Sequence, residues 1–233
     1  MNKSIIPYVP IADRIKADSS TSAYLKKRGF TVDQLKGLYT QEYYKDYDTQ
    51  VWSITLRFPI TDEDGNHGWW QRILDEQGVL PKTMFKKGWK SQGHSWLTPN
   101  TNYIESKEIW ITEGIFDTIA LWLSGITSFS CLSAGVGYYP SIFLNQLKQK
   151  CEANNLPLPK LVWAFDNDKA GHDGIFKNLE RAKAEGFECE VALPPLHRKK
   201  CDWNDLYMQN RLKLSDLEKY KVNGLQLQQG EQA

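Results

Sequence analysis

Three acidic residues of this 233-residue chain stand where a buried strand would end. Asp166 and Asp168 follow the apolar run 161–165, and Glu113 follows the segment 108–112. Carboxylate oxygens suit Mg²⁺ or Mn²⁺, and one carboxylate of such a set can act as general base on a hydroxyl nucleophile. An isolated Asp-x-Asp pair more often caps a helix or lies in a solvated turn. It is the ordered set that predicts a divalent-cation site acting on phosphates.

The residues around these acids fit the same chemistry. Gly114 lets the backbone turn without a Cβ, and Asp117 lies one helical turn beyond Glu113, where it can face the same side. Lys169 directly follows Asp168 and is placed to meet a phosphate. We therefore expect Asp117 and Lys169 to support the same site.

The elements that must position this site alternate along the second half of the chain. Strand patterns are followed by helical patterns, with strands expected at 108–114, 128–135, 161–168 and 187–195 and helices at 115–125, 140–155 and 172–186. This alternation predicts βαβ units and a mostly parallel sheet flanked by helices. Such sheets bind ligands outside the carboxyl ends of their strands, which is where Glu113 and the aspartates fall.

The first part of the chain has a different pattern. It predicts a helix over 19–29, a second short helix from Thr31 to Leu35, and a β-hairpin formed by 51–60 and 67–74. We expect three parts: a small α+β subdomain at 1–105, the α/β domain at 106–210, and a C-terminal helix with a polar tail at 211–233.

A basic cluster in the first part is interleaved with aromatic residues. Cations that track phosphates and rings that stack on bases together favour single-stranded nucleic acid as a ligand. The alternative is that the tryptophans are core and the lysines a solvated face. The cluster consists of Arg72, Lys82, Lys86, Lys87 and Lys90 with Trp69, Trp70, Phe85, Trp89 and Trp96.

Composition narrows the class of protein. The formal net charge is +1, and the four cysteines are scattered with no short pair, which argues against a zinc ribbon or a disulfide framework. The N-terminus does not resemble a signal peptide, and no apolar run is long enough to cross a membrane. A cytoplasmic protein without membrane contact is expected.

The segments ITEGIFDTIAL, SAGVGYY, VWAFDNDKAG and CDWNDLY resemble the Toprim domain shared by bacterial-type primases, topoisomerases and small nucleases. The resemblance implies that Glu113 is the catalytic acid/base, that Asp166 and Asp168 bind Mg²⁺ or Mn²⁺, and that Asp117 is a supporting acid. The late acidic motif matches less closely, through Asp202 and Asp205.

The segments AYLKKRGFTVDQL, LRFPITDEDGNHGWWQRIL and LPKTMFKKGWK resemble the N-terminal half of the RNA-polymerase core of bacterial and phage primases. The implied fold is a Toprim-type α/β domain preceded by a small α+β primase-core subdomain. Arg72 and Lys82 match the family best as nucleic-acid or nucleotide contacts, with Lys86, Lys87 and Lys169 beside them. The implied partners are a single-stranded DNA template, ribonucleoside triphosphates, and a replicative helicase or a separate zinc-bearing protein.

Some features depart from that family. No cysteine pair could build the usual zinc module, no Gly-rich Lys-Ser/Thr phosphate loop is present, and Lys169 replaces a common arginine. So compact a form indicates a phage, plasmid or other mobile-element origin.

Two other functions stay open: a Toprim nuclease or nickase with the same carboxylates, and a non-catalytic module that binds DNA or a replication protein. The Arg-Phe-Pro-Ile hairpin favours a primase over a nuclease, and the intact acids count against a non-catalytic module.

Overall fold

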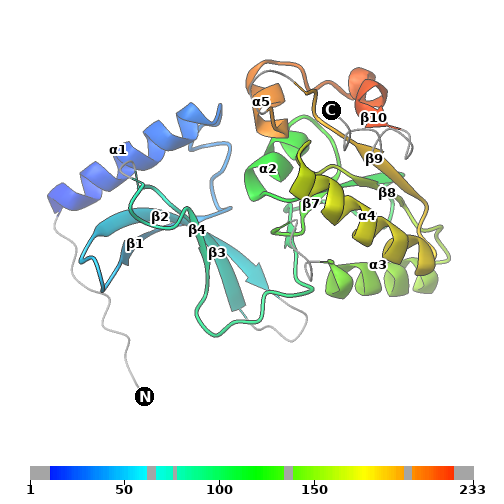
Figure 1. The fold of residues 1–233 in the computed structure, drawn as a ribbon, viewed down its shortest axis with the longest axis horizontal. Coiled ribbons are helices and arrows are strands. Elements are labelled where there is room, and N and C mark those ends of the chain that lie inside the picture. Colours follow the sequence, from blue (N-terminus) through cyan, green and yellow to red (C-terminus); the bar gives the residue numbers. More distant parts are fainter. Residues whose placement is uncertain (1–10, 62–66, 76–77, 134–138, 197–200, 223–233) are drawn as a thin grey trace. The chain divides into compact units, whose positions relative to one another are not determined.

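The structure is a computed structural model that describes residues 11–61, 67–75, 78–133, 139–196 and 201–222. It divides into two compact units (Figure 1). Unit 1 comprises residues 1–59 and 69–87, and unit 2 comprises 60–68 and 88–233.

Unit 1 is built on a four-stranded sheet with the strands in chain order. The predicted hairpin is confirmed, because its two segments form neighbouring strands. One further strand flanks each side of the pair. The elements are α1 (Ile11–Lys27), β1 (Thr40–Lys45), β2 (Trp52–Thr61), β3 (His67–Ile73) and β4 (Thr83–Phe85).

The helical predictions for unit 1 need two corrections. Helix α1 begins at Ile11 rather than at residue 19, since no glycine or proline interrupts residues 11–18. The second short helix is wrong, because residues 32–38 form turns. Thr31 does accept a hydrogen bond from the Gln34 backbone N–H at 3.2 Å, but Gly37, at φ +84°, ends the turn at once.

The core of unit 1 lies between α1 and one face of the sheet. Side chains alternate between the two faces of a strand. Phe58 and Trp70, whose ring centroids are 5.7 Å apart, therefore share a face with Arg72, which lies over Tyr24 of α1. Leu25 of the same helix is fully buried.

Unit 2 contains a six-stranded sheet in the order β10-β9-β8-β6-β7-β5. Its four central strands are parallel, as the sequence predicted, and each edge strand is antiparallel to its neighbour. The strands are β5 (Trp96–Leu97), β6 (Glu108–Thr112), β7 (Ser128–Ser130), β8 (Lys160–Trp163), β9 (Cys189–Ala192) and β10 (Lys221–Val222). The helices are α2 (Ile115–Leu123), α3 (Ser141–Ala153), α4 (Lys169–Ala184), α5 (Trp203–Met208) and the 3₁₀ helix η1 (Leu214–Tyr220).

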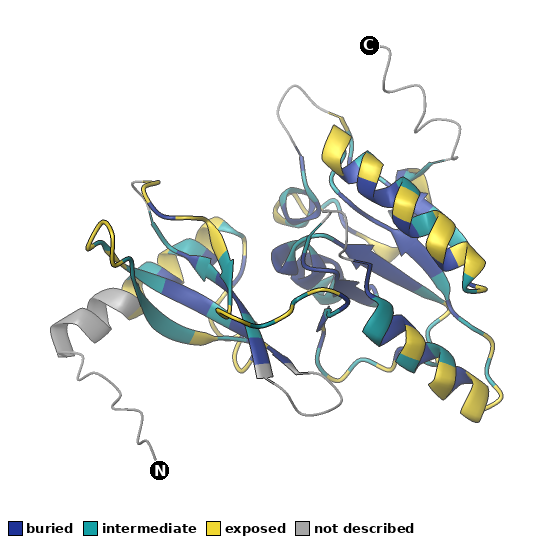
Figure 2. Cartoon of the chain, turned by 60° about the horizontal axis from the view of Figure 1, so that its bottom comes forward, coloured by how far each residue is buried: buried dark blue, intermediate teal, exposed yellow. Residues whose placement is uncertain are grey.

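Helices cover both faces of this sheet. Ile111 and Trp163 point into a core shared with α3 and α4, whereas Trp110, next to Ile111 in β6, packs against Trp203 of α5. Figure 2 shows the strands of this sheet in the dark blue of buried residues and the outer faces of the helices in yellow. Unit 2 is therefore a three-layer α/β structure.

The strand order creates a topological switch point. From β6 the chain passes through α2 to β7 on one side, then returns through α3 to β8 on the other side. Crossovers of the same hand that run in opposite directions place their helices on opposite faces. The carboxyl ends of β6 and β8 thus border the position where sheets of this kind bind ligands.

The sheet extends beyond the range 106–210 on both sides, through β5 and β10. The sequence pattern did not reveal these short strands, nor β1, β4 or α5. Strand β10 is fixed by ion pairs from Lys221 Nζ to Glu108, Glu190 and Glu218, at 2.7, 2.8 and 2.7 Å. The domain boundaries at 105 and 210 stay a prediction. Among the residues described, no helix is long and apolar enough to span a membrane.

Candidate active site

Glu113 and Asp166 meet at the switch point. The backbone N–H of Asp166, beyond the end of β8, donates to Glu113 Oε1 at 3.1 Å. Both residues are half-buried. Two acids separated by 53 residues in sequence are therefore brought to one edge of the sheet.

Asp168 caps the helix that follows β8. Its Oδ1 accepts the backbone N–H of Gly171 at 2.9 Å, and Asp168 is the N-cap of α4. A negative charge at the N-terminus of a helix also interacts favourably with the helix dipole. The structure thus gives Asp168 a structural role in addition to any role in chemistry.

Gly171 allows the first turn of α4 to approach the acids. A Cβ built on Gly171 would lie 2.1 Å from the Asp166 carbonyl oxygen and 3.1 Å from Glu113 Oε1. The Asp166 carbonyl accepts the N–H of Asp168 at 2.9 Å, which restrains it from moving away. Position 171 therefore needs a residue without a side chain.

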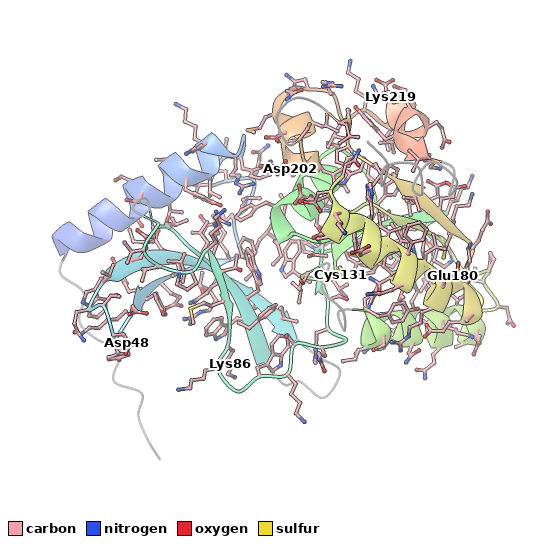
Figure 3. All side chains as sticks on the ribbon, viewed as in Figure 1. Asp48, Lys86, Cys131, Glu180, Asp202 and Lys219 are labelled. Atoms are coloured by element: carbon pink, nitrogen blue, oxygen red, sulfur yellow. The ribbon has the colours of Figure 1, made fainter. Side chains whose placement is uncertain are left out.

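Asp117 joins α2 to α5. Its Oδ1 accepts the backbone N–H of Asn204 at 3.1 Å. The late acids Asp202 and Asp205 form a capping box at the start of α5: Asp202 Oδ1 accepts the Asp205 N–H at 2.7 Å, and the Asp202 N–H donates to Asp205 Oδ2 at 3.2 Å. Figure 3 labels Asp202 at this helix start. The late acidic motif thus fixes α5 against the site.

Trp203, inside the late motif, was missed by the sequence reasoning. It is fully buried, and its indole N–H donates to the Ala164 carbonyl at 2.8 Å, two residues before Asp166. A large aromatic between two aspartates was the available signal, since buried tryptophans usually find a partner for the N–H.

Polar side chains brace the neighbouring loops. Ser130 Oγ donates to the Glu113 carbonyl at 2.9 Å, and Thr112 Oγ1 donates to the Gly114 carbonyl at 3.0 Å. Asn167 Nδ2 donates to the Pro194 carbonyl at 2.8 Å. The loop residues Gly135, Val136 and Gly137 lie outside the described part of the chain.

A cysteine close to Glu113 takes no part as a thiolate. Burial raises the pKa of the Cys131 thiol to about 12, and the Glu113 carboxylate contributes to the rise. The Cys131 thiol is therefore the protonated form at neutral pH, which is a poor nucleophile.

The basic residues occupy different places. Lys169 is exposed at the start of α4 in unit 2, whereas Lys82, Lys86 and Lys87 are exposed in unit 1. Arg72 is half-buried, with its guanidinium 5.7 Å from the Tyr24 ring centroid, and burial lowers its pKa. Two of the tryptophans are core, because Trp70 and Trp96 are only 7% and 4% exposed.

Residues 110–207 match the Toprim-like family model. A DNA primase of Mycoplasma pneumoniae is 31% identical over 159 residues, which are 64% of this chain and 22% of the primase. The uncharacterized protein MG010 of Mycoplasma genitalium is 29% identical over 190 residues, covering 80% of this chain and 79% of that protein.

Solved structures show the fold. The RNA polymerase domain of Mycobacterium tuberculosis primase DnaG matches with a TM-score of 0.65 and 15% identity, over 87% of this chain and 75% of that one. The same domain in complex with double-stranded DNA matches with a TM-score of 0.59 and 17% identity, over 90% and 76%. The chain contains a Toprim-like domain and has the fold of a primase RNA polymerase domain. It spans less than a quarter of the length of the M. pneumoniae primase.

The acids of the Toprim-like domain fit a divalent cation in chemical type. Glu113, Asp166 and Asp168 supply oxygen ligands at adjacent strand ends, and Mg²⁺ prefers such ligands. Among the described residues, however, no three acidic, histidine or cysteine side chains gather closely enough to hold a metal ion. One oxygen each of Glu113 and Asp168 instead accepts a backbone N–H. Gathering the three carboxylates around one cation thus requires side-chain rotation.

Proposed function

We propose that this chain is the catalytic core of a primase-type nucleotidyltransferase that makes short RNA primers on a single-stranded DNA template. The observation that carries the proposal is the meeting of Glu113 and Asp166 at the switch point of a Toprim-type sheet, with Asp168 two residues further on. The primase-type fold and the relatives named DNA primase support it.

In the proposed reaction, a 3′-hydroxyl attacks the α-phosphate of a ribonucleoside triphosphate, a phosphodiester bond forms, and pyrophosphate leaves. Glu113 accepts the hydroxyl proton, directly or through water. Asp166 and Asp168 hold Mg²⁺ or Mn²⁺, which when bound supplies charge stabilisation to the phosphates. Exposed Lys169 at the start of α4 adds a positive charge for the triphosphate.

Template and partners belong to the same proposal. Single-stranded DNA would contact the lysines of unit 1, with Lys82, Lys86 and Lys87 exposed there. The four cysteines are unpaired, three of them are buried, and no metal-binding group including them occurs in the described residues. We infer that a replicative helicase or a separate zinc-bearing protein assists initiation. The proposed location is the cytoplasm.

The test offers purified chain labelled ribonucleoside triphosphates and unlabelled single-stranded DNA, with Mg²⁺ or Mn²⁺. Labelled oligomers that depend on template, and that are absent with Glu113→Gln, are the expected result. Shortened DNA strands without oligomers would instead identify a nuclease. If neither oligomers nor shortened strands appear, even when a helicase from the same source is added, a catalytic function is contradicted.

A further inference from the structure

An arginine absent from the predicted basic cluster occupies the sheet of unit 1. The Arg57 guanidinium of β2 lies 4.3 Å from the ring centroid of Trp69 in β3. Its Nη2 donates to Gln71 Oε1 at 3.4 Å, and Gln71 is only 2% exposed. The plane of the guanidinium is therefore held by an indole and by a buried amide, while 29% of the Arg57 side chain stays exposed.

The pleat of the sheet separates Arg57 from Arg72. Neighbouring residues of a strand point to opposite faces. Gln71 contacts Arg57, so Arg72, the next residue, points to the other face, where it lies over Tyr24 of α1. Arg72 thus belongs to the face that α1 covers.

Two exposed lysines share the face of Arg57. Gln71 pairs with Met84 in β4, and the ladder continues on both sides: the Ile73 N–H donates to the Lys82 carbonyl, and the Lys86 N–H donates to the Trp69 carbonyl. Lys82 and Lys86 therefore alternate in step with Met84. Figure 3 labels Lys86 at the end of β4. We call the set Arg57, Trp69, Lys82 and Lys86 the Arg57 face.

The charge of the Arg57 face favours an anionic ligand. The described residues of this face include three basic side chains, and the Glu42 carboxylate, which is 40% exposed, lies 3.7 Å from Arg57 Nη1. Lysines attract phosphates, and an ordered guanidinium plane can stack on a nucleic-acid base. Bases offer a free face for stacking in a single strand but not in a duplex. This combination therefore suits single-stranded nucleic acid.

We infer that the Arg57 face binds the single-stranded DNA template, with the Arg57 guanidinium as the stacking contact, and that Arg72 is a structural cation of the α1 interface. The inference rests on the proposed function, whose template it places. The inference also changes the predicted basic cluster. Arg57, on the opposite face of the sheet, replaces Arg72 as the arginine that contacts the template.

The test compares the same substitution on the two faces. Arg57→Gln and Arg72→Gln each replace a half-buried arginine on a neighbouring strand, and binding of a fluorescent oligothymidylate is followed by anisotropy at several salt concentrations. Arg57→Gln should weaken binding about tenfold, the loss of roughly one stacked base, and flatten the salt slope by about 0.7. Arg72→Gln should lower the melting temperature and leave the affinity within about twofold. Arg57→Lys, which keeps the charge but not the plane, should weaken binding without flattening the salt slope.

Two outcomes would overturn the inference: unchanged affinity in both Arg57 variants, or a larger loss in Arg72→Gln than in Arg57→Gln at equal folded fraction. Primer synthesis is measured on the same samples. Wild-type chain that binds DNA through Arg57 but makes no primers refutes the proposed function alone. Wild-type chain that makes primers while Arg57→Gln binds normally refutes the inference alone.

Discussion

Replacing Gly171 by alanine tests the packing that holds the acidic site together. In a helix interior alanine is preferred to glycine by about 1 kcal/mol, so helix preference alone predicts a more stable protein. The new methyl group, however, would lie 2.1 Å from the Asp166 carbonyl oxygen, a backbone atom. Overpacking of this kind typically costs about 1–3 kcal/mol.

The free-energy cost of the steric overlap should exceed the gain from the helix preference of alanine. The Asp166 carbonyl is restrained by the Asp168 N–H at 2.9 Å, and the start of α4 is restrained by the Asp168 cap. We expect a net destabilisation of about 1–2 kcal/mol, seen as a melting temperature lower by roughly 2–8 °C. Because relief of the overlap must move either Asp166 or α4 by about 1 Å, primer synthesis should fall about a hundredfold.

Thermal unfolding and primer synthesis would be measured on the same preparation. Ala184→Gly, at the exposed end of α4, isolates the helix preference and should cost about 1 kcal/mol or less with full activity. If Gly171→Ala melts at or above the wild-type temperature and keeps its turnover, the close approach of α4 to Asp166 is refuted.

Substitutions at three further positions test other contacts of unit 2. Asp168→Asn keeps a good N-cap but loses the charge that favours the helix dipole, so primer synthesis should disappear while stability falls by less than about 1 kcal/mol. Asp168→Ala should lose about 1 kcal/mol more because the cap itself is lost. Wild-type turnover in Asp168→Asn would exclude the cation role. Trp203→Phe leaves the buried Ala164 carbonyl without its indole donor and should cost about 1–3 kcal/mol in urea unfolding, and a smaller loss would refute the anchoring role. Burial lowers the pKa of Lys221, but hydrogen bonds to its three carboxylates raise it overall. A raised folded-state pKa means that the ion pairs stabilise fully below the usual lysine pKa and lose this effect as the pH rises above it, so alkaline melting curves should show a decline that Lys221→Met lacks.

The sequence by itself was sufficient for the order of elements from β6 to β9 and for the position of the acids at their strand ends. Strand and helix periodicities are local, and each segment from β6 to β9 carries its own pattern and its own turn residues. Since parallel strands present their carboxyl ends on one edge, placing Glu113 and Asp166 at strand ends was enough to predict that they share an edge. The match to the Toprim-like model over residues 110–207 covers this same region.

Elements that carry no periodic pattern of their own could not be predicted from the sequence. Strands β5 and β10 have two residues each and exist only because a neighbouring strand pairs with them. The predicted helix near Leu35 failed for the opposite reason: its cap formed, but four or five residues cannot offset the cost of helix nucleation.

Only the tertiary structure determines the strand order and the hydrogen-bond partners of the polar side chains. Only the pairing of β8 beside β6 creates the switch point, and only the packing of α5 assigns Asp202 and Asp205 to a helix cap. The sequence places Arg57 and Arg72 on the two strands of one predicted hairpin but does not show which face of the sheet each occupies. Their register against β3 and α1 places them on opposite faces, because pairing across the sheet depends on residues far apart in the chain, and the pleat turns each register into a choice of face.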